Sequence, residues 1–501
     1  MDKKNIPIII GAAQFTQHKG TSKPLDPLSL MAKTSKMAID DSKSKKLVEY
    51  IDAVYMINII SWSYEDGPVE LSTRLGIKPI KKVYLPEGGH SPQMLVNRAA
   101  NDISSGEFRC ILVTGGEAAY SIFKTFQNQP PPYWPERKIP KYIEKKAWEY
   151  TNKVERKYGM INAPLTYAIL ETALRASSGR NPQKHNKYLG KLFEHFSKHA
   201  SNNPYSWTQE NYTAEEIITA FPENRYIDYP YTKRMCANVF VDQSASLLIT
   251  SEELAKTLNI DHKKWIYVMG GADLYNIPHV TQRPKLDNSP AVKEATRIAL
   301  RQAGLKLKDI DKFDLYSCFP SIVEIIMNEL EIKEDDPRDL TITGGLPYFG
   351  GPLSFYSLHS IINAVDLIRK NRSLKIFIVA NGGYNTKLSV GIYGSEPPVI
   401  PWGTHKDQEI QQSILKDALP EPVEMANGKL VIDGYSIKYD RSGQPEKAIF
   451  IGTLQNGKRA LAIIKSGLDI NLNLEAQELV GKTCIIEYDP QEDQNLVLSF
   501  E

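Results

Sequence analysis

The sequence carries the same order of motifs twice, and this duplication limits the fold more than any other feature. Each copy has a polar residue and proline before a helical stretch, an Ile-Asp strand, a Gly-Gly turn and a closing apolar strand. The first copy comprises Asp26-Pro27, Ile51–Met56, Gly88–Pro92 and Cys110–Gly116, and the second comprises Ser289-Pro290, Ile310–Tyr316, Gly350–Pro352 and Ile376–Gly383. A unit of roughly sixty residues from the Ile-Asp step to the closing strand is too long for a solenoid repeat and suits a half-domain. Two related halves predict a site where matching loops meet, at the Gly-Gly-His and Gly-Gly-Pro turns.

Charge and hydropathy exclude several classes of function. The 501 residues have a formal net charge of +2, so no basic field favours nucleic acid as a partner. The first residues show no signal-peptide pattern, and no apolar run approaches the roughly 18 residues that a membrane span needs. We therefore expect a cytoplasmic protein with no membrane span.

The four cysteines are far apart and form no Cys-x-x-Cys pair. A disulfide framework or a structural zinc site of that type is therefore not expected, and we predict no metal. Cys110 and Cys484 lie in apolar strand-like runs typical of buried, inert thiols. Cys318 lies in a different context and is a candidate for chemistry.

Changes in periodicity divide the chain into five parts. Alternating strands and helices fill the two halves, an aromatic and charged insertion interrupts the first half, and period-two alternation begins near Val423. The Asn456-Gly457 dipeptide predicts a hairpin turn within this last part. The predicted parts are an N-terminal half (1–120 and 236–270), a loop insertion (121–235), a C-terminal half (271–395), a linker (396–422) and a small antiparallel β-barrel (423–501).

Three further stretches carry a resemblance to the thiolase superfamily over about residues 6–395. Ala237–Ser246 resembles the thiolase Asp-Gly-Ala-Ala-Ala stretch, Ala303–Asp314 resembles the lead-in to the His-Glu-Ala-Phe motif, and Thr343–Gly345 resembles the Gly-Gly lead into the Gly-His-Pro motif. The set most resembles sterol-carrier-type thiolase-like proteins with an additional C-terminal β domain. The resemblance implies an α/β protein with the five-layered α-β-α-β-α duplicated fold, a helical loop insertion and a C-terminal antiparallel β-barrel.

The catalytic positions that the resemblance implies are mostly replaced. The nucleophilic cysteine falls at Gly89 or His90, and the sequence does not separate the two. The histidine of Gly-His-Pro is Gly351, the histidine of the His-Asp-Cys-Phe motif is Tyr316, and the late Cys-x-Gly loop reads Ala-Asn-Gly-Gly from Ala380. Only Cys318 keeps its family identity, where it resembles the acid/base. We therefore expect little thiolytic cleavage of acetoacetyl-CoA.

Seven residues remain candidates for the site, five of them with a structural alternative. The catalytic candidates are Cys318, His90 and Tyr316; the substrate-binding candidates are Ser91, Lys233, Gly351 and Asn381. The alternatives are a buried thiol at Cys318, a turn-stabilising His90, a packed Tyr316, a turn residue at Asn381 and a solvated Lys233. A reactive Cys318 would be reachable from the pocket with a lowered pKa.

Two classes of function stay open on the sequence. The first is an acyl-CoA-handling enzyme of the acetyl-CoA acetyltransferase class whose site is rebuilt around Cys318 and His90. The second is a non-catalytic acyl-CoA binder or scaffold that lost the nucleophile. Either would use a coenzyme A thioester as substrate or ligand and no other cofactor, as a homodimer through the thiolase fold or as a monomer.

Overall fold

A computed structural model describes residues 5–144, 149–404, 407–465 and 474–501. Residues 1–4 lie outside the described residues, and the prediction of no signal peptide rests partly on them. Residues 145–148 of the predicted insertion, 405–406 of the linker and 466–473 of the barrel also lie outside. Within the described residues, nine strands form one sheet with the order β3-β2-β4-β7-β1-β8-β11-β10-β9. In that order the strands are Lys81–Leu85, Ile51–Ile57, Cys110–Ala118, Asp242–Ser251, Pro7–Thr16, Ile266–Tyr275, Lys387–Gly394, Ile376–Gly382 and Lys312–Leu315.

The sheet consists of two halves that meet at one short pairing. Between β1 and β8 only Ile8 with Tyr267 and Ile9 with Ile266 are paired. On one side β2 is parallel to β3 and β4, and on the other β9 is parallel to β10. The strands from β3 to β1 form one half of the sheet and those from β8 to β9 form the other. Strand β8 starts at Ile266, inside the stretch 236–270 that the sequence analysis assigns to the N-terminal half.

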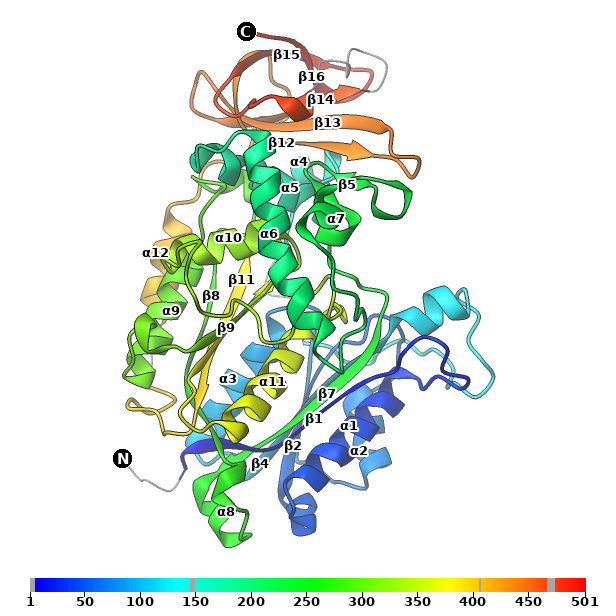
Figure 1. Ribbon diagram of the computed structural model, residues 1–501, viewed down its shortest axis with the longest axis vertical. Helices are drawn as coiled ribbons and strands as arrows, with labels where there is room; N and C mark the ends of the chain where they lie inside the picture. Colours follow the sequence, from blue (N-terminus) through cyan, green and yellow to red (C-terminus); the bar gives the residue numbers. More distant parts are fainter. Residues whose placement is uncertain (1–4, 145–148, 405–406, 466–473) are drawn as a thin grey trace.

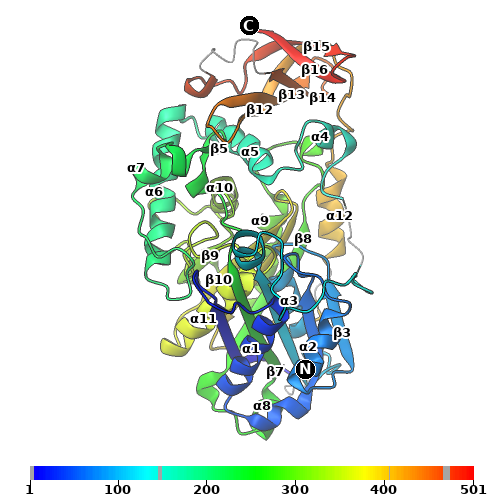
Figure 2. The same ribbon diagram turned by 90° about the vertical axis from the view of Figure 1, so that its right-hand side faces the viewer.

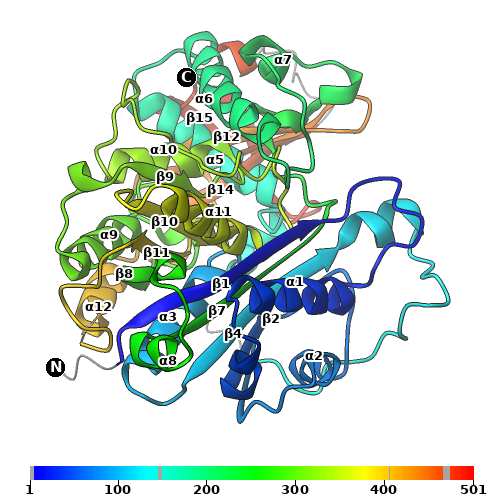
Figure 3. The ribbon, with the colours of Figure 1, turned by 60° about the horizontal axis from the view of Figure 1, so that its bottom comes forward.

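Helices cover both half-sheets in three layers, which confirms the five-layered fold (Figures 1 and 3). The middle layer is α3 (Ser91–Ser104) and α11 (Tyr356–Lys370), which contact each other and strands of both halves. The outer layers are α1 (Pro27–Asp41) with α2 (Gly67–Leu75), and α9 (Pro290–Ala303) with α10 (Pro320–Glu329) and α12 (Gln408–Lys416). The short α8 (Glu252–Thr257) follows β7. Because both faces of each half-sheet are covered, strands such as β4 and β10 are buried over their whole length.

Local sequence signals account for several helix ends. Asp26 caps α1 and Ser289 caps α9, each accepting a bond from a backbone N–H in the first turn, with proline following the cap. Gly304 ends α9 with φ +68, as the sequence predicts. Among the described residues, no helix is both long and apolar enough to cross a membrane.

The C-terminal strands close into a small barrel, as expected. Of the described strands, five take part: β12 (Gly428–Tyr439), β13 (Pro445–Leu454), β14 (Arg459–Lys465), β15 (Thr483–Asp489) and β16 (Gln494–Phe500). The Asn456-Gly457 hairpin joins β13 and β14, with Gly457 at φ +76. The pairs are antiparallel except β14 with β16, which is parallel and closes the barrel.

The insertion lies between the barrel and the large sheet (Figures 1 and 2). It contains α4 (Lys153–Lys157), α5 (Ala163–Ser177), α6 (Pro182–Ser201), α7 (Ala214–Ile218), β5 (Tyr226–Asp228) and β6 (Tyr231–Thr232). Strand β5 pairs with β12, and Thr172 of α5 bonds to both the N–H and the carbonyl of Tyr435. The insertion therefore joins the barrel to the duplicated fold.

Candidate functional site

The Gly88-Gly89-His90 turn lies where the two halves meet. It leads into α3, and the second half holds it in place: Gly88 N–H donates to Ser354 Oγ at 2.9 Å, and Ser357 Oγ donates to the Gly89 carbonyl at 3.2 Å. The sequence predicts Ser91 as the helix cap. In the structure His90 takes that position and Ser91 is the first helical residue, buried beside the turn.

The space beside Gly89 is already filled. A Cβ atom at this position would overlap the Tyr316 hydroxyl oxygen and the Asn381 carbonyl oxygen, both closer than 3 Å. A side chain at position 89 would therefore point at Tyr316 and Asn381, which lie in the two second-half stretches that resemble thiolase motifs. The His90 side chain instead lies against Gly382, where a Cβ would be 2.5 Å from His90 Nδ1.

His90 is buried and neutral. Burial, and then the charge of Lys387, lower its pKa to about 3. Its Nδ1 atom is buried without a hydrogen-bond partner among the described residues. A neutral imidazole can accept a hydrogen bond, but a pKa this low makes it a weak base at neutral pH.

Tyr316 and Cys318 follow β9, and both are buried. The Tyr316 N–H donates to the Val379 carbonyl at 3.1 Å, and its ring lies edge-on to Tyr356. Cys318 is 8% exposed, and burial raises its pKa to about 12. This is the reverse of the lowered pKa and open access expected of a reactive thiolate.

Asn381 is held by a tyrosine from the insertion. Its Nδ2 donates to Tyr167 Oη at 2.7 Å, and that hydroxyl donates to the Gly383 carbonyl at 2.7 Å. The Tyr167 ring stacks on Phe319 with centroids 4.8 Å apart. Asn381 Oδ1 is buried without a partner among the described residues. Sequence reasoning missed Tyr167, because nothing in its local pattern indicates a contact with a residue 214 positions away.

Gly351 and Lys233 lie outside this set of contacts. Gly351 is buried and donates its N–H to the Asn238 carbonyl at 2.9 Å. A Cβ there would make ordinary contacts of 3.4 to 3.5 Å with Leu346, Ala237 and Asn238. Lys233 is exposed on the turn Lys233–Met235. The structure thus brings together His90, Ser91, Tyr316, Cys318 and Asn381, whereas, within the described residues, Lys233 forms no hydrogen bond to any of them.

Two surface hollows lie apart from the turn. One, of about 440 Å³, is lined by His18, Lys19 and residues 207–210, and the other, of about 210 Å³, lies between α6 and the barrel. Neither is lined by residues of the 88–92 turn. The chemistry expected for this fold takes place at the 88–92 turn. The side-chain contacts at this turn are therefore a stronger guide to function than either hollow.

Comparisons with known proteins agree with the fold and with its extra domain. Residues 409–491 match the family described as the thiolase-like protein type 1 additional C-terminal domain. The crystal structure of a monomeric SCP2-thiolase-like protein type 1 from Mycobacterium smegmatis has 31% identity and a TM-score of 0.84, with 99% of each chain covered. Human mitochondrial 3-ketoacyl-CoA thiolase in complex with CoA has 17% identity and a TM-score of 0.54, covering 78% of this chain and 98% of that one.

Curated relatives match only in part. Sterol carrier protein 2 of Bos taurus is 25% identical over 261 residues, which are 50% of this chain and 43% of the bovine protein. The protein of the same name from Gallus gallus is 25% identical over 34% of this chain and 31% of its own length. The matches thus span less than half the length of these relatives, and they fall within the sterol-carrier type that the motifs indicate.

Proposed function

This chain belongs to the SCP2-thiolase-like proteins of type 1, and we propose that it binds coenzyme A thioesters without carrying out the thiolase reaction. The thiolase-type fold supports the choice of ligand, since one structural neighbour is described in complex with CoA. The filled space at Gly89 supports the absence of the reaction.

The observation that carries the proposal is the position of Tyr316. Thiolase chemistry needs a nucleophilic side chain at the start of α3, and we assign that position to Gly89 because a side chain there would point at Tyr316 and Asn381. The Tyr316 hydroxyl occupies this volume. The site therefore lacks both the nucleophile and the space for one.

The remaining candidates do not replace the nucleophile. With a pKa of about 12, the Cys318 thiol would be ionised to about one part in 10⁵ at pH 7. The low pKa of His90 leaves little driving force for taking a proton from a substrate. Covalent acyl transfer therefore has no activated group among these residues.

A second candidate function rests on two unpartnered atoms. His90 Nδ1 and Asn381 Oδ1 are both buried without a hydrogen-bond partner among the described residues. Such atoms are costly unless a ligand or water bonds to them. This favours an enzyme of the acyltransferase class in which the two atoms form hydrogen bonds to a polar group of the substrate.

We place the ligand between the insertion and the turn that contains Gly89. Tyr167 of α5 connects the two by bonding to Asn381 and Gly383. We also propose that the protein is monomeric, because the M. smegmatis neighbour is described as monomeric and shares the whole length of the chain.

Two measurements separate these functions. Calorimetry with CoA, acetyl-CoA and a long-chain acyl-CoA should show saturable binding, and no binding of any at millimolar ligand would refute the proposal. Thiolysis of acetoacetyl-CoA should stay at the solvent background. Turnover above background that is lost in Cys318→Ala or His90→Gln would establish the second function instead.

A further inference from the structure

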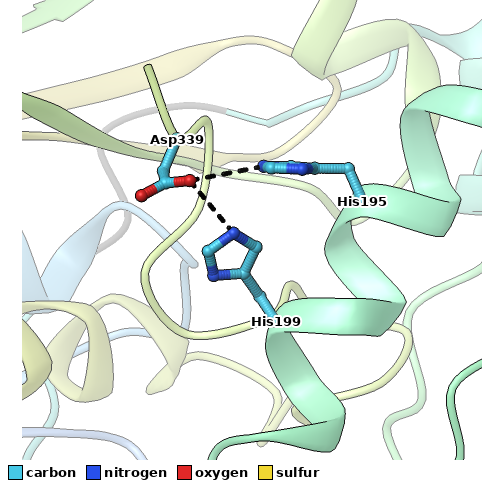
Figure 4. Close-up of side chains that lie close together, drawn as sticks. All are labelled: His195, His199 and Asp339. Carbon is cyan, nitrogen blue, oxygen red and sulfur yellow. Dashed lines mark ion pairs between the residues drawn. The ribbon is translucent and has the colours of Figure 1, made fainter. Parts of the chain in front are cut away.

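Helix α6 places two histidines beside a carboxylate from a distant part of the chain (Figure 4). His195 and His199 are four residues apart and so share one face of the helix. Asp339 lies in the segment after α10, and its backbone carbonyl accepts a hydrogen bond from the Phe313 N–H of β9. One ligand atom from each of the three side chains lies within 4.8 Å of the other two.

The distances suit a small divalent ion. His199 Nε2 is 3.2 Å and His195 Nε2 is 3.9 Å from the same atom, Asp339 Oδ1. A tetrahedral Zn²⁺ with bonds of about 2.0 to 2.1 Å keeps neighbouring ligand atoms roughly 3.3 Å apart. The His199–Asp339 separation already matches this value, and the His195–Asp339 separation exceeds it by about 0.6 Å.

His195 has an unused ligand atom. Its Nε2 is buried without a hydrogen-bond partner among the described residues, although the side chain as a whole is 39% exposed. A metal ion binds an unprotonated ring nitrogen of histidine, and in the described part of the chain His195 Nε2 has no other partner that would compete for it.

Asp339 is held so that one of its oxygens faces the histidines. Lys312 Nζ forms an ion pair with Oδ2, and both histidines face Oδ1. The lysine orients the carboxylate for one-oxygen ligation, as outer partners of metal ligands do. Its positive charge also weakens cation binding, so we expect an affinity on the order of micromolar.

A second cluster, Glu171, His185 and Glu324, already has internal partners. His185 Nε2 is 2.7 Å from Glu171 Oε1, Tyr231 donates to Glu171, and Arg180 lies 3.4 Å from Glu324. A cation would have to break the His185–Glu171 pair and the Arg180–Glu324 pair. The cluster of His195, His199 and Asp339 is therefore the better site.

We infer that His195, His199 and Asp339 bind a divalent transition-metal ion of the Zn²⁺ type, with a fourth position open to water. The ion would tie the end of α6 to the loop beside β9. The two already pack closely, because Asn203 Nδ2 donates to the Thr343 carbonyl at 3.1 Å and a Cβ at Gly344 would overlap Ala200. The ion is thus a clamp between the insertion and the C-terminal half.

The test is metal titration of full-length protein without a histidine tag. Calorimetry with Zn²⁺ should give one ion per chain, and Co²⁺ should give the intense visible absorption of a tetrahedral centre. His195→Gln and His199→Gln should each weaken binding by at least about tenfold. Zn²⁺ should raise the thermal midpoint of the wild type and not of His199→Gln.

The control is His262→Gln, which removes a histidine remote from the cluster, in the turn His262–Lys264. It should bind Zn²⁺ like the wild type. Asp339→Asn is less decisive because it also breaks the ion pair with Lys312, whereas the two histidine variants keep that pair. No saturable binding by the wild type at millimolar Zn²⁺, or binding that survives His199→Gln, would overturn the inference.

Discussion

The Gly-Gly turn of the first half and its counterpart in the second half differ in the space beside the second glycine. At Gly89 the volume that a side chain would need is taken by the Tyr316 hydroxyl and the Asn381 carbonyl. At Gly351 a Cβ would make only ordinary contacts. A side chain is therefore blocked at position 89 and has room to start at position 351, although both read as glycine in the sequence.

The largest effect should come from Gly89→Cys, which puts the family nucleophile back. Its Cβ and Sγ would overlap Tyr316 and the backbone of Asn381, so we expect a loss of about 3 kcal/mol in the free energy of unfolding. Denaturant unfolding measures this loss, and an acetoacetyl-CoA assay should show no gain in thiolysis. A stable variant with thiolase activity would contradict the assignment of position 89.

Adding Tyr316→Ala to Gly89→Cys should recover part of that loss, because it removes the overlapping hydroxyl. We expect a coupling free energy of about 2 kcal/mol between the two sites. A double-mutant cycle of Gly89→Cys, Tyr316→Ala and the double variant measures it. Additive effects would mean that the backbone at Asn381, and not Tyr316, closes the position.

His90 should make the free energy of unfolding depend on pH, whereas Pro352, which follows the Gly-Gly pair in the second turn, has no side chain that titrates. Its folded pKa of about 3 lies below the ordinary histidine pKa of 6.5, so between these values the unfolded chain binds a proton that the folded one does not. Stability should therefore fall as pH drops below about 6.5, by about 1 to 2 kcal/mol at pH 5. His90→Gln should weaken the measured dependence of unfolding free energy on pH, leaving the part that comes from other groups such as the buried His359, whose pKa is also lowered to about 3.

The smallest effect should come from Gly351→Ala. The new methyl group meets its neighbours at 3.4 to 3.5 Å, and the φ angle at this position lies outside the left-handed region. We expect a change in unfolding free energy below about 0.5 kcal/mol, measured beside Gly89→Ala as the matched variant. Equal losses in the two alanine variants would remove the difference between the turns.

Much of the fold followed from local signals. The caps at Asp26 and Ser289, the αL residue Gly304 and the Asn456-Gly457 hairpin all lie where the sequence places them. These signals act over a few residues and need no tertiary partner. Ser91 was misplaced by one position, since a cap differs from the first helical residue only in backbone angles that its neighbours decide.

The candidate site could be predicted from the sequence only in part. The family motifs led to Gly89, His90, Tyr316, Cys318 and Asn381, and these residues do lie together. The buried state of Cys318 and the hydrogen bond of Asn381 to Tyr167 could not be predicted, because both depend on the tertiary contacts that Tyr167 of α5 makes with the second half. Their catalytic and binding roles stay predictions.

The sequence by itself determined the duplicated halves and the extra β domain, and it predicted the loss of the family's nucleophile, because these are properties of residue identity and period. The tertiary structure decided which of Gly89 and His90 faces the second half, how β14 and β16 close the barrel in parallel, and that His195 and His199 meet Asp339. Each of these joins atoms far apart along the chain. Side-chain direction at such a contact is set by the packing of whole helices and strands, which local spacing does not encode.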